Sequence, residues 1–131
     1  MKLPLKTRRW DDPREAGDGL RILITRYRPR GLKKADETWD FWWKELAPSA
    51  GLLADFHGRE GAPITWEQYR PRYLAEMESQ RAKIDSLARH VLGGEPLTLL
   101  CSSACTNPLQ CHRTLLEKLV RDAAKAGSGA A

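Results

Sequence analysis

The chain has three cysteines, Cys101, Cys105 and Cys111, which lie in one short segment with His112 and Arg113 directly after the last. Thiolates and imidazoles are the ligands that a tetrahedral zinc site needs, which makes Cys101, Cys105, Cys111 and His112 candidate zinc ligands. A cysteine beside a histidine, an arginine and a helix start can also have its pKa lowered and become a nucleophile. On that hypothesis Cys111 is the nucleophile and His112 is its base or orienting partner.

A third interpretation of this segment requires no chemistry. Neither a CxxC pair nor a zinc-finger spacing is present, and free cysteines are often buried simply as small apolar residues. Cys101 and Cys105 would then pack inside, Cys111 would face solvent and His112 would hydrogen-bond locally. The sequence leaves metal binding, thiol reactivity and packing open as alternatives.

The cysteine segment is predicted to connect a strand to a helix. Leu97 to Leu100 form a short apolar run, typical of a strand buried in a parallel sheet, and Cys101 ends it. Asn107 and Pro108 have the residue types of a helix start. Apolar residues then recur at helical spacing: Leu115, Leu116, Leu119, Val120, Ala123 and Ala124. In open α/β sheets, ligands bind beyond the carboxyl ends of the strands, so the cysteines are expected at such a crevice.

A strongly basic segment follows a second predicted strand, which covers residues 20–25. The segment reads RYRPRGLKK from Arg26 to Lys34. If the two strands are parallel neighbours, its arginines would face the cysteine segment and bind a phosphate or carboxylate, with Tyr27 as a stacking surface. The candidate anion-binding residues are Arg26, Tyr27, Arg28, Arg30 and Arg113. The alternative is a solvated basic loop fixed by Pro29 and Gly31.

Three further segments are assigned from local signals. A short helix is predicted from Asp36 or Thr38 to Ala47, and it would crowd Trp39, Phe41, Trp42 and Trp43 together. Residues 51–63 are predicted to be a mobile connection. A capping box at Thr65 to Gln68 begins a long helical stretch that ends at Gly93, with Pro71 near its start.

Length and composition predict a single α/β domain over residues 1–125, with a small, mostly parallel sheet flanked by helices in a Rossmann-like arrangement, and a flexible tail over residues 126–131. No apolar run approaches the roughly 20 residues that span a bilayer, and the first residues lack a signal-peptide pattern. We therefore expect a cytoplasmic protein without membrane association. Its odd number of cysteines favours reduced thiols over a disulfide framework.

The charge pattern limits the partners without identifying one. The net charge of +5 comes from 22 basic and 17 acidic residues, which are interspersed outside the basic segment. The favoured hypothesis is an anion- or nucleotide-binding crevice with an anionic small molecule as ligand, and a thiol-dependent enzyme is the activity considered for it. The alternative is a nucleic-acid or nucleotide-binding module with structural or zinc-bound cysteines. A third class is a subunit that recruits a partner protein through its tryptophans.

Four blocks in this order resemble the YeaO-like family of uncharacterised bacterial proteins. They are RYRPRG from Arg26, WKELAPS from Trp43, WEQY from Trp66 with Arg72-Tyr73-Leu74, and LTLL from Leu97. The resemblance covers about residues 1–125 and implies a compact α/β domain. A related branch has a Leu-Leu-Cys strand end and a Cys-His-Arg triplet, similar to the segments that end at Cys101 and Arg113, whereas Cys105 departs from that pattern. No catalytic residue can be carried over from the family.

Overall fold

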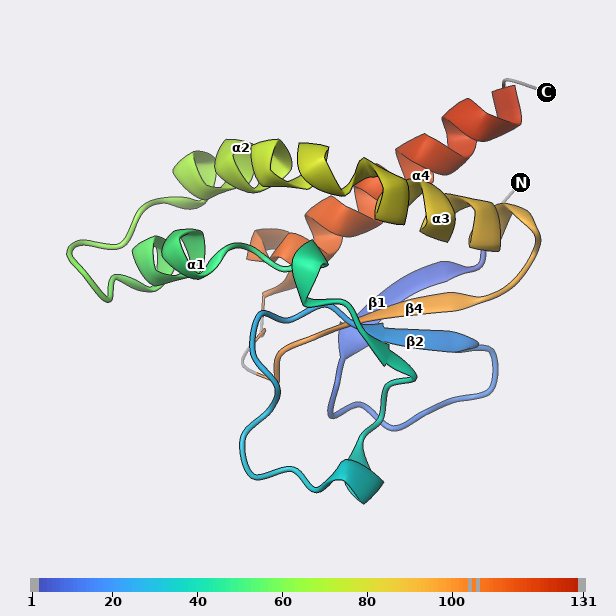
Figure 1. Cartoon of the computed structure of the whole chain (residues 1–131), viewed down its shortest axis with the longest axis horizontal. Helices are drawn as coiled ribbons and strands as arrows, with labels where there is room; N and C mark the ends of the chain where they lie inside the picture. Colours follow the sequence, from blue (N-terminus) through green and yellow to red (C-terminus); the bar gives the residue numbers. More distant parts are fainter. Residues whose placement is uncertain (1–2, 104, 106, 130–131) are drawn as a thin grey trace.

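A four-stranded parallel sheet forms the centre of the fold (Figure 1). The computed structural model describes residues 3–103, 105 and 107–129. Its strands are β1 (Leu5–Arg9), β2 (Leu20–Leu23), β3 (Phe41–Trp42) and β4 (Leu97–Cys101). They are arranged in the order β1-β4-β2-β3, and every pairing is parallel. All five residues of β4 are buried, as its apolar run predicts. The predicted α/β class with a small parallel sheet is confirmed.

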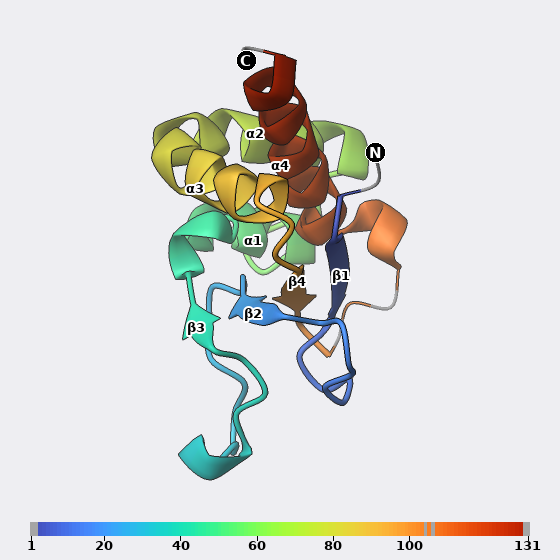
Figure 2. The same ribbon diagram turned by 90° about the vertical axis from the view of Figure 1, so that its right-hand side faces the viewer.

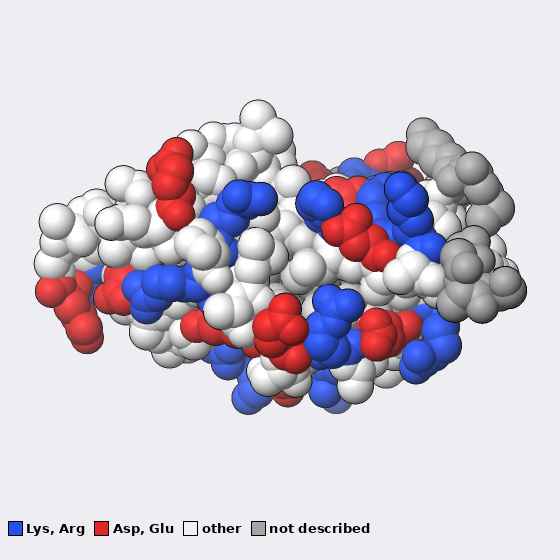
Figure 3. Space-filling model, turned by 90° about the horizontal axis from the view of Figure 1, so that it is seen from above, with Lys and Arg blue, Asp and Glu red and all other residues white. Residues whose placement is uncertain are grey.

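The helices lie on one side of this sheet. They are α1 (Ala50–His57), α2 (Trp66–Met77), α3 (Arg81–Leu92) and α4 (His112–Gly129). Figures 1 and 2 show all of them above the strands, so the predicted flanking by helices holds for one face only. The core between the helices and the sheet includes Ile22, Leu99, Ile84, Leu116 and Val120. Basic and acidic side chains alternate over the outer surface of this helical layer (Figure 3).

The opposite face of the sheet is partly polar and is covered by the loop between β1 and β2. Side chains alternate between the two faces of a strand, which directs Arg21 and Thr98 away from the helices. Arg21 is fully buried and its Nη1 donates to Asp18 Oδ2 over 2.8 Å, while the Thr98 hydroxyl donates to the Asp18 carbonyl oxygen over 2.8 Å. Lys6 Nζ lies 2.6 Å from Asp18 Oδ1. A buried ion-pair cluster therefore takes the place of a second helical layer.

Two of the local predictions are wrong. Residues 38–47 are not a helix: they contain the edge strand β3 and a single 3₁₀ turn over Lys44–Leu46. Trp42 Nε1 donates to the carbonyl oxygen of Thr25 over 2.7 Å, which ties the segment to the chain that leaves β2. The predicted mobile connection over residues 51–63 contains most of α1, which begins after the N-cap residue Ser49 and ends at Gly58 in the left-handed conformation.

The long helical stretch follows the prediction more closely, whereas the C-terminus differs from it. The Thr65 to Gln68 capping box is present, and α2 accommodates Pro71. A 3₁₀ turn over Glu78–Gln80 divides the stretch into α2 and α3. Helix α4 continues through Gly129, so residues 126–129 of the predicted tail are helical, whereas residues 130 and 131 lie outside the described residues. None of the helices described is long and apolar enough to cross a membrane.

Candidate functional site

A cavity of about 940 Å³ lies at the carboxyl edge of the sheet. The chain that follows β1, β2 and β4 forms much of its wall, and the end of α1 and the start of α4 complete it. This is the position where parallel α/β sheets bind their ligands. The lining residues are Trp10, Thr25, Arg26, Tyr27, Arg28, Pro29, Arg30, Pro48, Leu53, Phe56, His57, Arg59, Tyr69, Cys101, Ser102, Ser103, Cys105, Asn107, Gln110, Cys111 and His112.

The structure places the basic segment and the cysteine segment on the same cavity, as expected for neighbouring parallel strands. β2 pairs directly with β4, so the residues that follow these strands emerge side by side. All of the predicted anion-binding residues line the cavity except Arg113. Arg113 is 8% exposed, and its Nε has no hydrogen-bond partner among the residues that the structure describes. It lies behind the cavity wall.

The arginines around the cavity divide into two groups. Arg26 donates from Nε to the Pro48 carbonyl oxygen over 3.0 Å, and Arg28 forms an ion pair with Glu37 at 2.9 Å. These two side chains hold the basic segment in place. Arg30 and Arg59 are exposed, and within the described part of the chain no hydrogen bond or ion pair engages their guanidinium groups. Both are available to a ligand.

No carboxylate occurs among the described residues that line the cavity, although the chain contains 17 acidic residues. The lining instead includes the four arginines named above, together with His57 and His112. The sequence did not predict His57 or Arg59 as site residues. They reach the cavity because α1 ends beside it, and α1 itself was not predicted. The left-handed Gly58 that ends α1 could have indicated this turn in the sequence. Apart from the cysteines, the charged side chains that line the cavity are therefore basic.

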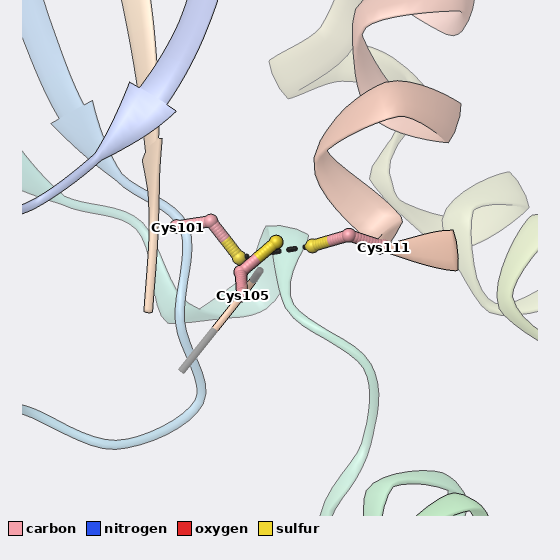
Figure 4. A group of neighbouring side chains, drawn as sticks. All are labelled: Cys101, Cys105 and Cys111. Carbon is pink, nitrogen blue, oxygen red and sulfur yellow. Dashed lines mark hydrogen bonds between the residues drawn. The ribbon is translucent and has the colours of Figure 1, made fainter. Parts of the chain in front are cut away.

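Three sulfur atoms meet at the cavity wall, and we call Cys101, Cys105 and Cys111 the cysteine cluster (Figure 4). Cys101 ends β4, Cys111 directly precedes α4, and Cys105 lies on the loop between them. The three Sγ atoms all lie within 4.8 Å of one another, and Cys101 Sγ is 3.1 Å from Cys111 Sγ. All three cysteines are free in this structure.

The three thiols differ in exposure and in pKa. Cys101 and Cys111 are buried, whereas Cys105 is partly exposed. Hydrogen bonds from Cys101 and Cys111, helped by the charge of Arg113, outweigh the burial of Cys105 and lower its pKa to about 3. Hydrogen bonds to Cys105 and Cys111, together with burial, raise the pKa of Cys101. Negative charge in the cluster therefore resides on the most exposed sulfur.

Cys111 remains a neutral thiol. A hydrogen bond from Cys101 lowers its pKa, but the hydrogen bond with Cys105 and burial outweigh this and raise the pKa to about 11. Cys111 is 9% exposed, so the solvent-facing position that the packing interpretation gives it is wrong. Cys101 is buried, as that interpretation expects.

His112 is a buried, neutral side chain at the first position of α4. Burial lowers the pKa of its imidazole to about 4. Its Nε2 lies 2.7 Å from the carbonyl oxygen of Ile24, which can only accept, so Nε2 carries the proton and Nδ1 is an acceptor. Nδ1 lies 3.9 Å from Cys111 Sγ. Because Cys111 is extended and precedes the helix, two adjacent residues can present their side chains to each other.

The cysteine cluster is close enough to share one metal ion, and it is the one such group of three or more ligand side chains that the described residues form. His112, the fourth predicted ligand, does not belong to this group, although its Nδ1 lies 3.9 Å from Cys111 Sγ. Three thiolates would leave one tetrahedral position open toward the cavity, as in catalytic rather than structural zinc sites.

The tryptophans do not form an exposed patch. The rings of Trp10 and Trp39 meet edge to face at 6.5 Å, and Arg28 lies 5.8 Å from the Trp39 ring. Trp43 packs against the core. Phe41, which is 53% exposed, is the large apolar side chain of this segment that remains open to solvent.

Residues 5–124 match a protein family described as the active DUF488-N3 subclade. The chain is 38% identical to the uncharacterised protein YeaO of Escherichia coli over 117 residues, which cover 89% of this chain and 96% of the relative. It is 32% identical over 103 residues to uncharacterised proteins of Mycobacterium tuberculosis and Mycobacterium bovis, covering 79% of this chain and 81% of each relative. No solved structure gives a significant match. These findings confirm the resemblance that the four sequence blocks indicate.

Proposed function

The chain belongs to the DUF488-N3 family, in the subclade described as active, and on that premise we propose that it is a thiol-dependent enzyme for an anionic small molecule. Cys105 is the nucleophile in this proposal. The observation that carries it is the composition of the cavity: a partly exposed cysteine faces a space lined by arginines, without a carboxylate among the described lining residues.

In this proposal, different side chains of the cavity bind the substrate and react with it. Arg30 and Arg59 would bind the phosphate or carboxylate of the substrate through charge-assisted hydrogen bonds. Cys105 would then form a bond from its Sγ to the electrophilic centre, and the leaving group would depart with the bonding electrons. Cys101 and Cys111 stabilise the thiolate by donating hydrogen bonds, and the neutral His112 imidazole lies beside Cys111, with Nδ1 3.9 Å from its Sγ. Exposure and pKa favour Cys105 over Cys111 as the attacking sulfur.

Paired alkylation tests this proposal. Iodoacetate and iodoacetamide attack the same thiolate in the same way, but only iodoacetate carries a charge. We expect both reagents to modify Cys105 first in the folded protein. The iodoacetate-to-iodoacetamide rate ratio should exceed that of the unfolded chain by about tenfold or more, because a hydrogen bond to a charged group is worth roughly 1.5–3 kcal/mol. Peptide mapping by mass spectrometry locates the modified cysteine.

Two controls make this test specific. Replacing Arg30 and Arg59 by alanine should abolish the preference for iodoacetate, whereas Arg70→Ala, an exposed arginine of α2 that does not line the cavity, should leave it unchanged. Modification of Cys101 or Cys111 before Cys105, or a rate ratio equal to that of the unfolded chain, would contradict the proposal.

The converging sulfur atoms of the cysteine cluster support a second candidate, a zinc centre with its open position on the cavity. We expect, on this alternative, a native mass spectrum with one zinc ion per chain. The ion should be lost in Cys101→Ser, Cys105→Ser or Cys111→Ser and retained in Ser103→Ala, a neighbour on the cavity wall. Zinc would also protect all three thiols from alkylation. A metal-free mass with reactive Cys105 would favour the enzyme. Both candidates require reduced thiols, and we therefore also propose a cytoplasmic location.

A further inference from the structure

The closest pair of sulfur atoms in the structure has no role in nucleophilic attack by Cys105. Cys101 Sγ and Cys111 Sγ are 3.1 Å apart, and both atoms are buried. One belongs to the central strand and the other to the residue before α4, so a bond between them would join the sheet directly to a helix. Both thiols are free in this structure. Two thiols this close can donate two electrons to an oxidant by forming a disulfide.

An oxidant that enters from the cavity would reach a different cysteine first. Cys101 is 3% exposed and Cys111 is 9% exposed, whereas Cys105 is partly exposed on the cavity wall. Cys105 hydrogen-bonds both of the other thiols. Figure 4 shows its sulfur beside theirs, on a loop rather than on a strand or helix. An oxidant that enters the cavity therefore meets Cys105 first, with the buried pair directly behind it.

We propose that the cysteine cluster reduces hydroperoxides, with Cys105 as the reacting thiol and a Cys101–Cys111 disulfide as the product. This activity goes beyond the proposed function, because it requires the three thiols and no anionic substrate. A peroxide is small and uncharged, so it can enter a cavity that selects anions without using the arginines.

The reaction balances in three steps. The Cys105 thiolate attacks one oxygen of the hydroperoxide, the O–O bond breaks, and an alkoxide or hydroxide leaves and takes up a proton, which gives a sulfenic acid on Cys105. The Cys111 thiol displaces that hydroxyl group as water and forms a Cys105–Cys111 disulfide. Cys101 then attacks Cys111 Sγ and releases Cys105 as a thiol. The hydroperoxide gains two electrons, and Cys101 and Cys111 lose them.

The positions of the three residues favour this end product over the two other disulfides. Cys101 is fixed by the pairing of β4 with β1, and Cys111 is fixed because its carbonyl oxygen accepts from the Thr114 amide over 3.2 Å. Cys105 lies on the connecting loop, so its release costs no strand or helix contact. The exchange therefore returns the exposed cysteine to its reduced form.

Stoichiometric oxidation tests the proposal. Reduced protein is mixed with one equivalent of hydrogen peroxide and quenched with acid, and its intact mass and alkylated peptides are then measured. We expect the loss of two hydrogen atoms, a Cys101–Cys111 disulfide and one remaining thiol, at Cys105. Treatment with a dithiol should restore all three thiols.

Single-residue variants should stop the three-step reaction at defined intermediates. Cys111→Ser should accumulate a sulfenic acid on Cys105 that dimedone traps, and Cys101→Ser should stop at the Cys105–Cys111 disulfide. Cys105→Ser should slow disulfide formation by about tenfold or more, because the two remaining thiols are buried and an oxidant in the cavity reaches them poorly. Ser103→Ala, on the same wall, should react as the wild type does.

Four results would overturn the inference: three thiols that stay reduced, Cys105 within the final wild-type disulfide, disulfides only between chains, or an undiminished rate in Cys105→Ser. None of these results bears on the preference for iodoacetate over iodoacetamide. Failure of the peroxide chemistry is therefore distinguishable from failure of the proposed enzyme.

Discussion

Asp18→Asn is expected to lower the free energy of unfolding by about 3–5 kcal/mol, the usual cost of removing one partner from a buried ion pair. Asp18 and Arg21 are both fully buried, and Arg21 Nη1 lies 2.8 Å from Asp18 Oδ2. The asparagine would leave the Arg21 guanidinium charged inside the protein without its counter-ion. Denaturant unfolding followed by circular dichroism measures the loss.

Two comparisons separate the buried pair from a general effect of charge. Asp122→Asn removes an exposed helix ion pair with Lys118 and should cost no more than about 1 kcal/mol. The double variant Asp18→Asn with Arg21→Met removes both buried charges and should be more stable than Asp18→Asn alone. Equal stability of Asp18→Asn and Asp122→Asn would mean that Arg21 does not depend on Asp18.

The same pair predicts how stability responds to acid. Burial opposes the ionisation of Asp18, but the hydrogen bond and charge of Lys6, the Glu15 backbone and Arg21 outweigh it and lower the pKa from 3.8 to about 2. Because the folded pKa is the lower one, this contribution to stability is complete above pH 3.8 and is lost as the pH falls through about 2. Asp18→Asn should lack this part of the pH dependence.

Local sequence signals predict the elements whose burial is apolar and continuous. The Leu97 to Leu100 run gives β4, the capping box gives the start of α2, and the apolar repeat after Asn107 gives α4. β1 has no such signal, because its Lys6 and Arg8 alternate with Leu5 and Thr7. Those basic side chains pair with Asp18 and Glu15 in the following loop, and this partnership exists only after folding.

The errors have a common physical origin in tertiary contacts. Residues 38–47 contain tryptophans that suit a helical face or a strand, and pairing of Phe41 and Trp42 with β2 decides for the strand. By contrast, α1 has local signals at both ends: Ser49 caps its start, and Gly58 ends it. The glycines and the proline among residues 51–63 led to the prediction of a connection instead of that helix.

The site was predictable in outline and not in its details. Strand ends place the basic segment and the cysteines on one crevice, because parallel neighbours share an edge. Which cysteine faces the cavity depends on the loop conformation, and which arginines are available depends on partners far along the chain. Arg26 binds a carbonyl oxygen that follows β3, and Arg59 enters from α1. Residue type alone could not separate these roles.

Replacing Arg30 and Arg59 together by alanine is expected to weaken the binding of inorganic pyrophosphate by about 100-fold or more. Both guanidinium groups line the cavity without a partner among the described residues. A hydrogen bond to a charged group is worth roughly 1.5–3 kcal/mol, so two together are worth about 3–6 kcal/mol. Every 1.4 kcal/mol changes an affinity by about tenfold. Isothermal titration calorimetry at fixed ionic strength measures the change.

Two other arginine variants serve as controls for this test. Arg70→Ala should bind pyrophosphate as the wild type does, while Arg28→Ala should lower the melting temperature, because it breaks the ion pair with Glu37 that fixes the basic segment. Unchanged affinity in the double variant would contradict the anion-binding role of the cavity.

The salt dependence of binding distinguishes the remaining ligand classes. A nucleic acid that contacts many phosphates loses affinity steeply as salt rises, whereas pyrophosphate held by two arginines loses far less. A steep slope with an oligonucleotide, together with no pyrophosphate binding, would favour a nucleic-acid-binding module over an enzyme.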